Sequence, residues 1–228
     1  MSARVEESYR ERLAALRADV VAMGDLVVER LERALESLRT GDDELARAVI
    51  DGDSEINERY LALEGNCIDL FALQQPVASD LRFVATSFKV LTDLERIGDL
   101  ATNLANYGLA ATAEVVPEVA IDDIGTDATR LVERALAAYR TDDADACRAI
   151  AADDDEIDAL CQHASETVVR DLIEREATDD GLWSVEQVLD DVSRVLLTIR
   201  DLERIADHAV NIAARTLYMV ETSTELIY

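Results

Sequence analysis

Acidic side chains recur at helical spacing in four places along the chain. Two residues four positions apart on a helix project from the same face, so each pair presents two oxygen-bearing groups together. Carboxylate and amide oxygens suit Mg²⁺, Ca²⁺, Mn²⁺ or iron, which makes these pairs candidate metal ligands. The pairs are Asp53 with Asn57, Glu95 with Asp99, Asp154 with Asp158, and Glu203 with Asp207.

The positions of the pairs along the chain place them opposite one another in two helical hairpins. Residues at one level of an antiparallel hairpin lie equally far from its turn. The first two pairs are symmetric about Pro76, and the last two are symmetric about the junction of Asp180 and Gly181. Each hairpin is therefore expected to gather four of these side chains between facing helices, where bundles commonly hold metals.

The acidic pairs are also compatible with a purely structural role. Each acidic block contains an arginine, Arg96 or Arg204, and pairing of arginine with carboxylates across helices accounts for the pattern equally well. His208 has the chemistry of a ligand, although a structural histidine is the more ordinary interpretation. The Glu-x-x-His motif of ferritin-like di-iron enzymes is absent, because Ala206 stands three residues after Glu203. No glycine-rich phosphate loop, Ser/His/Asp set or Cys/His cluster occurs, so the sequence favours a protein that is not an enzyme.

The elements that must position these residues come from a tandem duplication. Glu32-Arg-Ala-Leu35 recurs as Glu133-Arg-Ala-Leu136, and Asp93-Leu-Glu-Arg-Ile97 recurs as Asp201-Leu-Glu-Arg-Ile205. Apolar residues at spacings of three, four and seven predict six long helices in an all-α fold. The linker at Pro117 divides the chain into repeats 1–115 and 116–228. The predicted helices cover about 13–40, 44–73, 80–112, 122–140, 143–176 and 184–220.

Composition limits the class of protein. Only 8 Gly and 2 Pro occur among 228 residues, which suits long uninterrupted helices. A net charge of −27 with a single lysine, Lys89, indicates a halophilic protein, and an ordinary acidic protein is the alternative. Because no basic patch is present, direct nucleic acid binding is not expected. The three cysteines, the missing signal peptide and the lack of a long apolar span predict a cytoplasmic protein with buried thiols.

Three segments together resemble the PhoU family of phosphate-transport regulators. They are Gln74-Gln-Pro-Val-Ala-Ser-Asp-Leu-Arg82, Leu94-Glu-Arg-Ile-Gly-Asp99 and Leu202-Glu-Arg-Ile-Ala-Asp207. The resemblance implies two three-helix bundles related by pseudo-twofold symmetry. It also implies a cytoplasmic accessory protein that restrains a phosphate transporter through its ATPase or permease. A signalling kinase or a transcriptional regulator is the further partner implied.

The resemblance also implies multinuclear iron or zinc clusters, one in each repeat. The matching positions are Asp53, Glu95 and Asp99 in the first repeat, and Asp154, Asp158, Glu203 and Asp207 in the second. Asn57 departs from the acidic pattern, so the first site should hold its ion more weakly. Mg²⁺, Ca²⁺ and Mn²⁺ are the alternatives from the chemistry of the oxygens alone.

Three functions follow as hypotheses. The leading one is a negative regulator of phosphate uptake and phosphate-starvation signalling that works by protein contact and binds metal. The second is a metal store or metal-dependent enzyme built as a helical bundle without a phosphate role. The third is a plain helical scaffold, and the flat faces of long bundles are also compatible with a homodimer.

Overall fold

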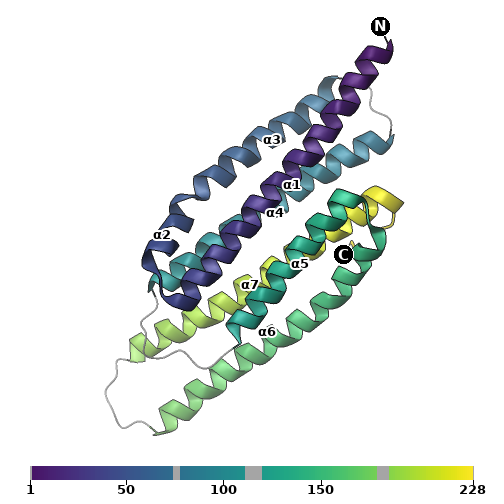
Figure 1. The fold of residues 1–228 in the computed structure, drawn as a ribbon. Coiled ribbons are helices and arrows are strands. Elements are labelled where there is room, and N and C mark those ends of the chain that lie inside the picture. The colour runs from purple at the N-terminus through teal and green to yellow at the C-terminus, as the bar shows by residue number, and fades with distance from the viewer. Residues whose placement is uncertain (1, 74–77, 111–119, 179–184, 228) are drawn as a thin grey trace.

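The chain is almost entirely α-helical in the computed structural model, which describes residues 2–73, 78–110, 120–178 and 185–227 (Figure 1). No β-strand occurs within these ranges. Long helices are what the sequence demands, because good helix formers dominate and few glycines or prolines interrupt them. The helical segments in the described ranges are α1 (Ser2–Thr40), α2 (Asp43–Asp51), α3 (Asp53–Leu73), α4 (Ala78–Ala110), α5 (Ile121–Thr141), α6 (Ala144–Thr178) and α7 (Val185–Glu221).

The second predicted helix is wrong in one respect, because it is not continuous over 44–73. Gly52 separates α2 from α3. Arg30 of α1 lies at this break, and its guanidinium nitrogen Nη1 is 1.3 Å from where a Cβ of Gly52 would stand, so only glycine leaves room for it. Arg30 donates to the Ala48 carbonyl at 3.3 Å and to the Glu55 carboxylate at 2.7 Å, so it binds the chain on both sides of the break.

The tight turns between the first two helices of each repeat have the expected caps. Gly41 adopts a left-handed φ of 66°, and Asp42 then accepts hydrogen bonds from two backbone amides in the first turn of α2. In the second repeat Asp142 takes the left-handed position with φ of 57°, and Asp143 accepts from the amide of Ala146 at 2.9 Å. The same turn therefore occurs in both repeats, and Asp142 takes the left-handed position that Gly41 has in the first repeat.

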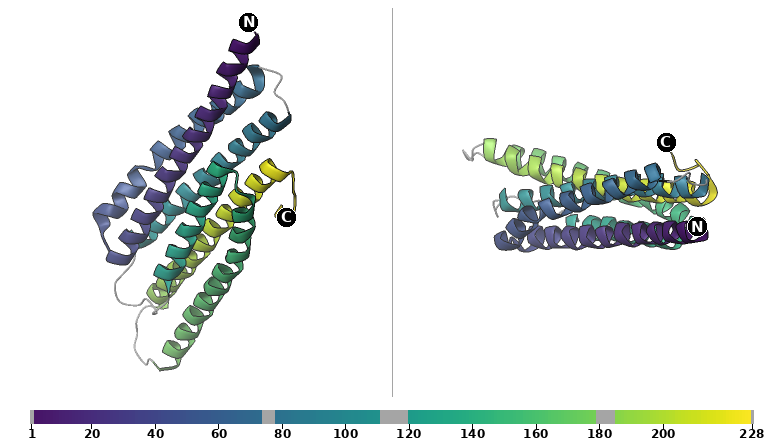
Figure 2. Two further views of the ribbon diagram at one scale, coloured as in Figure 1. Left: turned by 45° about the vertical axis from the view of Figure 1, so that its right-hand side comes forward. Right: turned by 90° about the horizontal axis from the view of Figure 1, so that it is seen from above.

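Each repeat forms a bundle, and the two bundles join through equivalent helices. In the first bundle α1 packs against α2, α3 and α4, and in the second α5 packs against α6 and α7. The bundles contact each other along α4 and α7 and along α1 and α5 (Figures 1 and 2). Because α4 matches α7 and α1 matches α5, each contact pairs a helix with its own duplicate, as a pseudo-twofold axis requires. The predicted fold of two tandem three-helix bundles is confirmed.

A reciprocal contact fixes how closely α1 and α5 approach. A Cβ on Gly24 would lie 2.4 Å from a methyl carbon of Leu136, and a Cβ on Gly125 would lie 2.7 Å from one of Leu35. Gly24 matches Gly125 in the duplication, and Leu35 matches Leu136. The repeated Glu-Arg-Ala-Leu segments therefore supply two leucines that each fill the space beside a glycine of the opposite repeat.

Several sequence predictions fall outside the described residues. These are the turns at Pro76 and at Asp180 and Gly181, the linker at Pro117 with the repeat boundary beside it, and the first residue of the helix predicted over 184–220. Among the helices that the structure describes, none combines the length and the apolar character needed to cross a membrane.

Candidate metal centres

The first cluster consists of Asp53 and Asn57 on α3 and Glu95 and Asp99 on α4. Asp53 accepts a hydrogen bond from Asn57 Nδ2 at 2.8 Å and another from Thr102 Oγ1 at 3.2 Å. The Asp53 charge also acts on both carboxylates of α4. The two helices thus bring three carboxylates and one amide into a single patch.

The negative charge of the first cluster is partly neutralised. Burial raises the pKa of Glu95, and Asp99 adds to that rise; burial and then Asp53 raise the pKa of Asp99. Arg96 acts in the opposite direction, because its guanidinium lies 3.5 Å from Glu95 and 3.6 Å from Asp99. The first cluster therefore has one arginine near two of its carboxylates, Glu95 and Asp99. Its third carboxylate, Asp53, has two neutral hydrogen-bond donors.

The second cluster has four carboxylates, Asp154 and Asp158 on α6 and Glu203 and Asp207 on α7. Burial, followed by the charges of Asp158 and Asp207, raises the pKa of Asp154 to about 7. The pKa values of Glu203 and Asp207 are also raised, by burial first and by Asp158 next. In addition, Asp154 Oδ1 is buried and has no hydrogen-bond partner.

Two substitutions between the repeats account for the unpartnered oxygen of Asp154. Its counterpart Asp53 is bound by Asn57 and Thr102, and the duplication places Asp158 and Val210 at those two positions. Neither a carboxylate nor an isopropyl group donates a hydrogen bond. The second cluster has therefore lost both donors and gained one negative charge.

Arginine pairing across helices, the structural alternative to metal binding, does not describe these clusters. Arg96 pairs with acids of its own helix, and Arg204 lies 3.6 Å from Asp201, also on its own helix. Arg204 does lower the pKa of Asp207, but after burial and Asp158 have raised it. Arginine therefore offsets the first cluster directly and the second only from a distance.

The donor set fits a hard cation in chemistry, although the side chains do not surround one point. Among the described residues, no group of three or more His, Cys, Asp and Glu is arranged to hold an ion. The oxygens of the second cluster are nevertheless of the type that hard cations bind, and one of them, Asp154 Oδ1, is buried without a hydrogen-bond donor. Cys161 is close to these acids, and burial and then Glu203 raise the pKa of its thiol to about 12, so the thiol is protonated when no metal is beside it. Cys67, Cys147 and Cys161 are all buried and free, as expected.

The first acid of each repeated block has a different role, which the sequence did not indicate. Asp93 and Asp201 are buried where α4 meets α7. Asp93 pairs with Arg215 of α7, and Asp201 accepts from Tyr107 of α4 at 3.0 Å. Positions 107 and 215 are equivalent in the duplication, so the two contacts are reciprocal across the pseudo-twofold axis. The shared position of both partners in the repeat was the signal that could have revealed them.

His208 makes its hydrogen bond at this interface, and it also lowers the pKa of Asp207 in the second cluster. Its Nδ1 lies 3.0 Å from Asp93 Oδ1 of the opposite repeat, and the side chain is 18% exposed. Burial, followed by the charge of Arg204, lowers the pKa of His208, which favours the neutral ring. A structural role for this histidine is what the contacts support.

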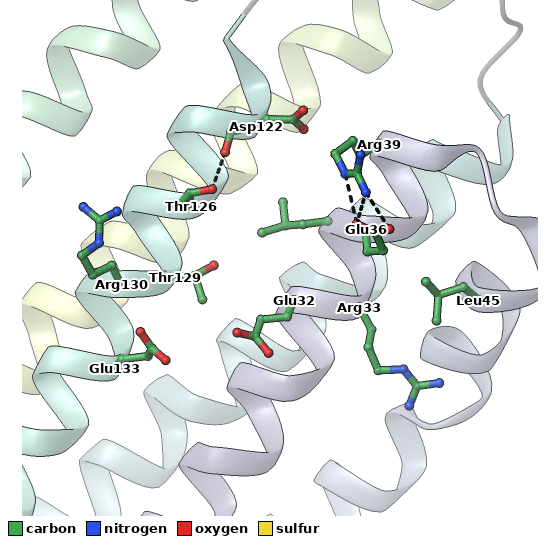
Figure 3. Close-up of a pocket in the computed structure, with 11 residues that line it drawn as sticks. Glu32, Arg33, Glu36, Arg39, Leu45, Asp122, Thr126, Thr129, Arg130 and Glu133 are labelled. Carbon is green, nitrogen blue, oxygen red and sulfur yellow. Dashed lines mark hydrogen bonds and ion pairs between the residues drawn. The ribbon is translucent and has the colours of Figure 1, made fainter.

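A hollow of about 530 Å³ lies at the seam between α1, α2 and α5 (Figure 3). Glu32 of α1 and Glu133 of α5 match in the duplication and point toward each other across it. Arg39 pairs with Glu36 on its rim at 2.7 Å. Because acidic and basic side chains both line the hollow, the lining does not select a cation or an anion.

Comparison with known protein families agrees with the duplication. The family described as the PhoU domain matches the chain twice, over residues 20–108 and 121–216. The chain is 31% identical over 219 residues to the phosphate-specific transport system accessory protein PhoU homolog of Pseudomonas aeruginosa, covering 95% of this chain and 86% of that protein. It is 32% identical to PhoU homolog 1 of Thermotoga maritima over 221 residues, which are 96% of this chain and 90% of that protein.

Solved structures show the same architecture. The crystal structure of PhoU from Pseudomonas aeruginosa superposes with a TM-score of 0.86 at 30% identity, covering 94% of this chain and all (100%) of that one. The phosphate transport system regulatory protein PhoU from Streptococcus pneumoniae gives a TM-score of 0.83 at 28% identity, covering 95% of this chain and 98% of that one. The likeness therefore extends over both repeats.

Proposed function

We propose, because the chain belongs to the PhoU family, that it is an accessory regulator of a phosphate-specific transport system and acts by contact with other proteins. The observation that carries the proposal is the match of both repeats to one family whose relatives bear that name. The partners we infer are the ATPase or permease of the transporter, together with a signalling kinase or transcriptional regulator. The role is restraint of uptake rather than catalysis.

Deletion of the gene tests this role. We expect phosphate uptake and phosphate-starvation transcripts to stay high in phosphate-rich medium, because the restraint is gone. Reintroduction of the gene should return both to the parental level. Unchanged uptake and transcripts at high and low phosphate would remove the phosphate role and leave a metal-binding bundle as the alternative.

We also propose that the second cluster binds a cation and that the first binds one more weakly. Support comes from the Asp154 oxygen without a donor and from four carboxylates with little compensation. Asp154, Asp158, Glu203 and Asp207 would hold the ion, and iron, zinc or a hard divalent cation would supply positive charge between α6 and α7. The residues themselves hold the two helices in register around it, so the site would stabilise the second bundle.

Elemental analysis of protein purified without chelator tests the metal proposal. We expect bound metal in the unaltered protein and a loss of most of it in a variant carrying Asp154→Asn and Asp207→Asn. Glu156→Gln is the matched control, because Glu156 is an exposed acid on the same helix outside the cluster. Equal metal content in all three proteins, or no metal in any, would contradict the assignment.

A further inference from the structure

A pocket of about 430 Å³ lies where the two repeats meet, at the end of the molecule where α4 begins and α7 ends (Figure 1). Both repeats supply its apolar lining: Leu13 of α1 and Phe83 of α4 come from the first, and Met219 and Val220 of α7 come from the second. We call it the junction pocket. Its volume and its place between two structural units are typical of a binding site.

Arg17 holds the wall of the junction pocket in place. Its guanidinium donates to the Tyr139 carbonyl at 2.5 Å and to the Asp142 carboxylate at 2.7 Å, which ties α1 to the end of α5. The same guanidinium lies 4.8 Å from the ring centroid of Phe83 and 5.3 Å from that of Tyr139. The pocket is therefore preformed, and the charge of Arg17 is offset by Asp142 within the protein.

Asp80 is the acid of the junction pocket that is left without a cation. Arg17 pairs with Asp142, whereas Asp80 forms no ion pair with any residue in the described ranges. Ser79 Oγ donates to Asp80 at 3.5 Å, which is the long limit of a hydrogen bond. The pocket therefore has one carboxylate whose charge is available to a ligand.

The hydroxyl of Tyr9 also lacks a partner near Asp80. Tyr9 is only 7% exposed, and within the described part of the chain no hydrogen bond reaches its hydroxyl oxygen. Burial raises the pKa of Tyr9 and the charge of Asp80 raises it further, against a smaller opposite effect of Arg12, so the carboxylate acts on this hydroxyl. Buried polar groups are normally hydrogen-bonded. An unpartnered hydroxyl near an unpaired carboxylate points to a ligand that donates to both.

The duplication shows that the fold does not require an acid at position 80. Asp80 lies in the first turn of α4, where a negative charge stabilises the end of a helix. The equivalent position of the second hairpin is nevertheless Val188, and Phe83 of the pocket corresponds to Asp191. Asp80 also belongs to the segment 74–82, which resembles the PhoU family and occurs in the first repeat only. The acid and the ring of the pocket are therefore specific to the first repeat.

The chemistry of the junction pocket determines its occupant. Carboxylate and hydroxyl oxygens accept hydrogen bonds from a cationic donor, and the apolar lining accommodates a ring beside it. An anion would meet Asp80 and Asp142, while the donors of Arg17 are in use. An aromatic side chain with a neighbouring arginine combines the required groups, and both are enriched where proteins bind one another. A second copy of this chain would bring together two net charges of −27, which is unfavourable.

We propose that the junction pocket receives an aromatic side chain and a neighbouring arginine of a partner protein, and that Asp80 binds the arginine. This inference rests on the proposed function, since it names a site through which a contact-based regulator acts. Because the pocket is built from both repeats, the partner reads the way in which the two bundles are joined.

Capped dipeptides test the chemistry of the junction pocket directly. The probes are acetyl-Phe-Arg-amide, acetyl-Phe-Gln-amide, acetyl-Phe-Glu-amide and acetyl-Ala-Arg-amide. Binding is measured by nuclear magnetic resonance titration of the isotopically labelled protein in about 0.5 M KCl, which screens the general attraction of a cation to an acidic protein. We expect Phe-Arg to bind about threefold more tightly than Phe-Gln or Ala-Arg, and Phe-Glu to bind most weakly. Equal binding of Phe-Arg and Phe-Gln, or no binding by any probe, would overturn the proposal.

Variants with matched controls locate the binding. Asp80→Asn should abolish the preference for Phe-Arg over Phe-Gln. Asp123→Asn should keep it, because Asp123 is a first-turn acid of α5 outside the pocket and its loss costs the same interaction with a helix end. Val220→Ser should weaken both Phe peptides about threefold without unfolding the protein, since Val220 is 40% exposed near the end of α7. Leu61→Ser on α3 is its control, and an unchanged preference in Asp80→Asn would contradict the assignment.

The deletion strain relates the junction pocket to function and separates this proposal from the proposed function. The double variant Asp80→Asn with Val220→Ser should fail to restore phosphate repression, whereas Asp123→Asn with Leu61→Ser should restore it. If the deletion leaves phosphate uptake and transcripts unchanged, the phosphate role fails, while the peptide titrations still decide the chemistry of the pocket. If the deletion has its effect but the double variant restores repression fully, the pocket is not the site of a partner. Light scattering that shows a dimer for the unaltered protein and a monomer for the double variant would assign the pocket to a second copy and overturn the partner proposal.

Discussion

The two acidic clusters occupy the same backbone frame and differ in how their charge is offset. Asp53 of the first cluster has two hydrogen-bond donors, and Arg96 lies beside the other acids. Asp154 of the second has one oxygen without a donor. Two side-chain differences, Asp158 for Asn57 and Val210 for Thr102, thus remove both hydrogen-bond donors from the matching aspartate and add one carboxylate to the cluster.

The buried acids where α4 meets α7 differ in the same manner. Asp93 depends on Arg215 and His208 from the opposite helix. Asp201 has Tyr107 and Asn103 from the opposite helix, at 3.0 and 3.3 Å, and also arginines from its own. After a duplication, the two copies can therefore share one fold while the partners of a buried charge change independently.

The largest expected effect comes from removing the partner of Asp93. Arg215→Met should destabilise the protein by about 3 kcal/mol, because it leaves a buried carboxylate with only a neutral histidine. Tyr107→Phe at the equivalent position should cost about 1 kcal/mol, because Asp201 keeps several other donors. Denaturant unfolding of both variants measures the difference. Equal losses would show that the two interface acids are equivalent and would break the comparison.

The second effect concerns the charge of Asp154 and its dependence on pH. Because the pKa of Asp154 is raised from 3.8 to about 7, the folded protein binds more protons than the unfolded chain between these values. Stability should therefore fall as the pH rises through this window, by about 2 kcal/mol after allowance for solvent screening of a half-buried group. Asp154→Asn should flatten the profile and stabilise the metal-free protein at neutral pH.

Asp53→Asn is the matched variant in the first repeat. Relief of repulsion with Asp99 should be offset to within about 0.5 kcal/mol by the loss of one acceptor oxygen, because asparagine keeps only one of the two that bind Asn57 and Thr102. Thermal unfolding in chelator from about pH 4 to about pH 8 measures both variants. A pH profile that is unchanged in Asp154→Asn would contradict the assignment of the titrating group.

How far the sequence predicts these sites depends on whether the cause is local. Spacing along one helix and symmetry about one turn predicted that Asp154 and Asp207 belong together, because both rules operate within a hairpin. The contact of Asp93 with Arg215 depends on how one bundle meets the other, which helix periodicity does not specify. The position of Arg30 at the Gly52 break likewise depends on how α1 packs on α2 and α3, because its side chain fills the space beside Gly52 from another helix.

A third prediction exchanges the residues that distinguish the clusters. Asn57→Asp should raise the affinity of the first cluster for a divalent cation about tenfold, and Asp158→Asn should lower that of the second by a similar factor, because each changes the local charge by one. Chelator competition followed by elemental analysis measures both, with Glu156→Gln as the control. Affinities that do not respond to the exchange would show that charge count is not what separates the two sites.

The smallest expected difference tests whether the seam itself is symmetric. Gly24→Ala and Gly125→Ala both gain about 1 kcal/mol of helix propensity, and both place a methyl group against a leucine of the other repeat. Leu136 is only 3% exposed and has little room to move, so Gly24→Ala should be destabilising by about 1 kcal/mol. Leu35 is less buried and lines the hollow of Figure 3, so it can turn aside, and Gly125→Ala should be neutral or slightly stabilising. If the denaturant midpoints of both variants shift in the same direction by the same amount, the two glycine–leucine contacts between α1 and α5 are energetically equivalent. The unequal burial of Leu35 and Leu136 would then not matter.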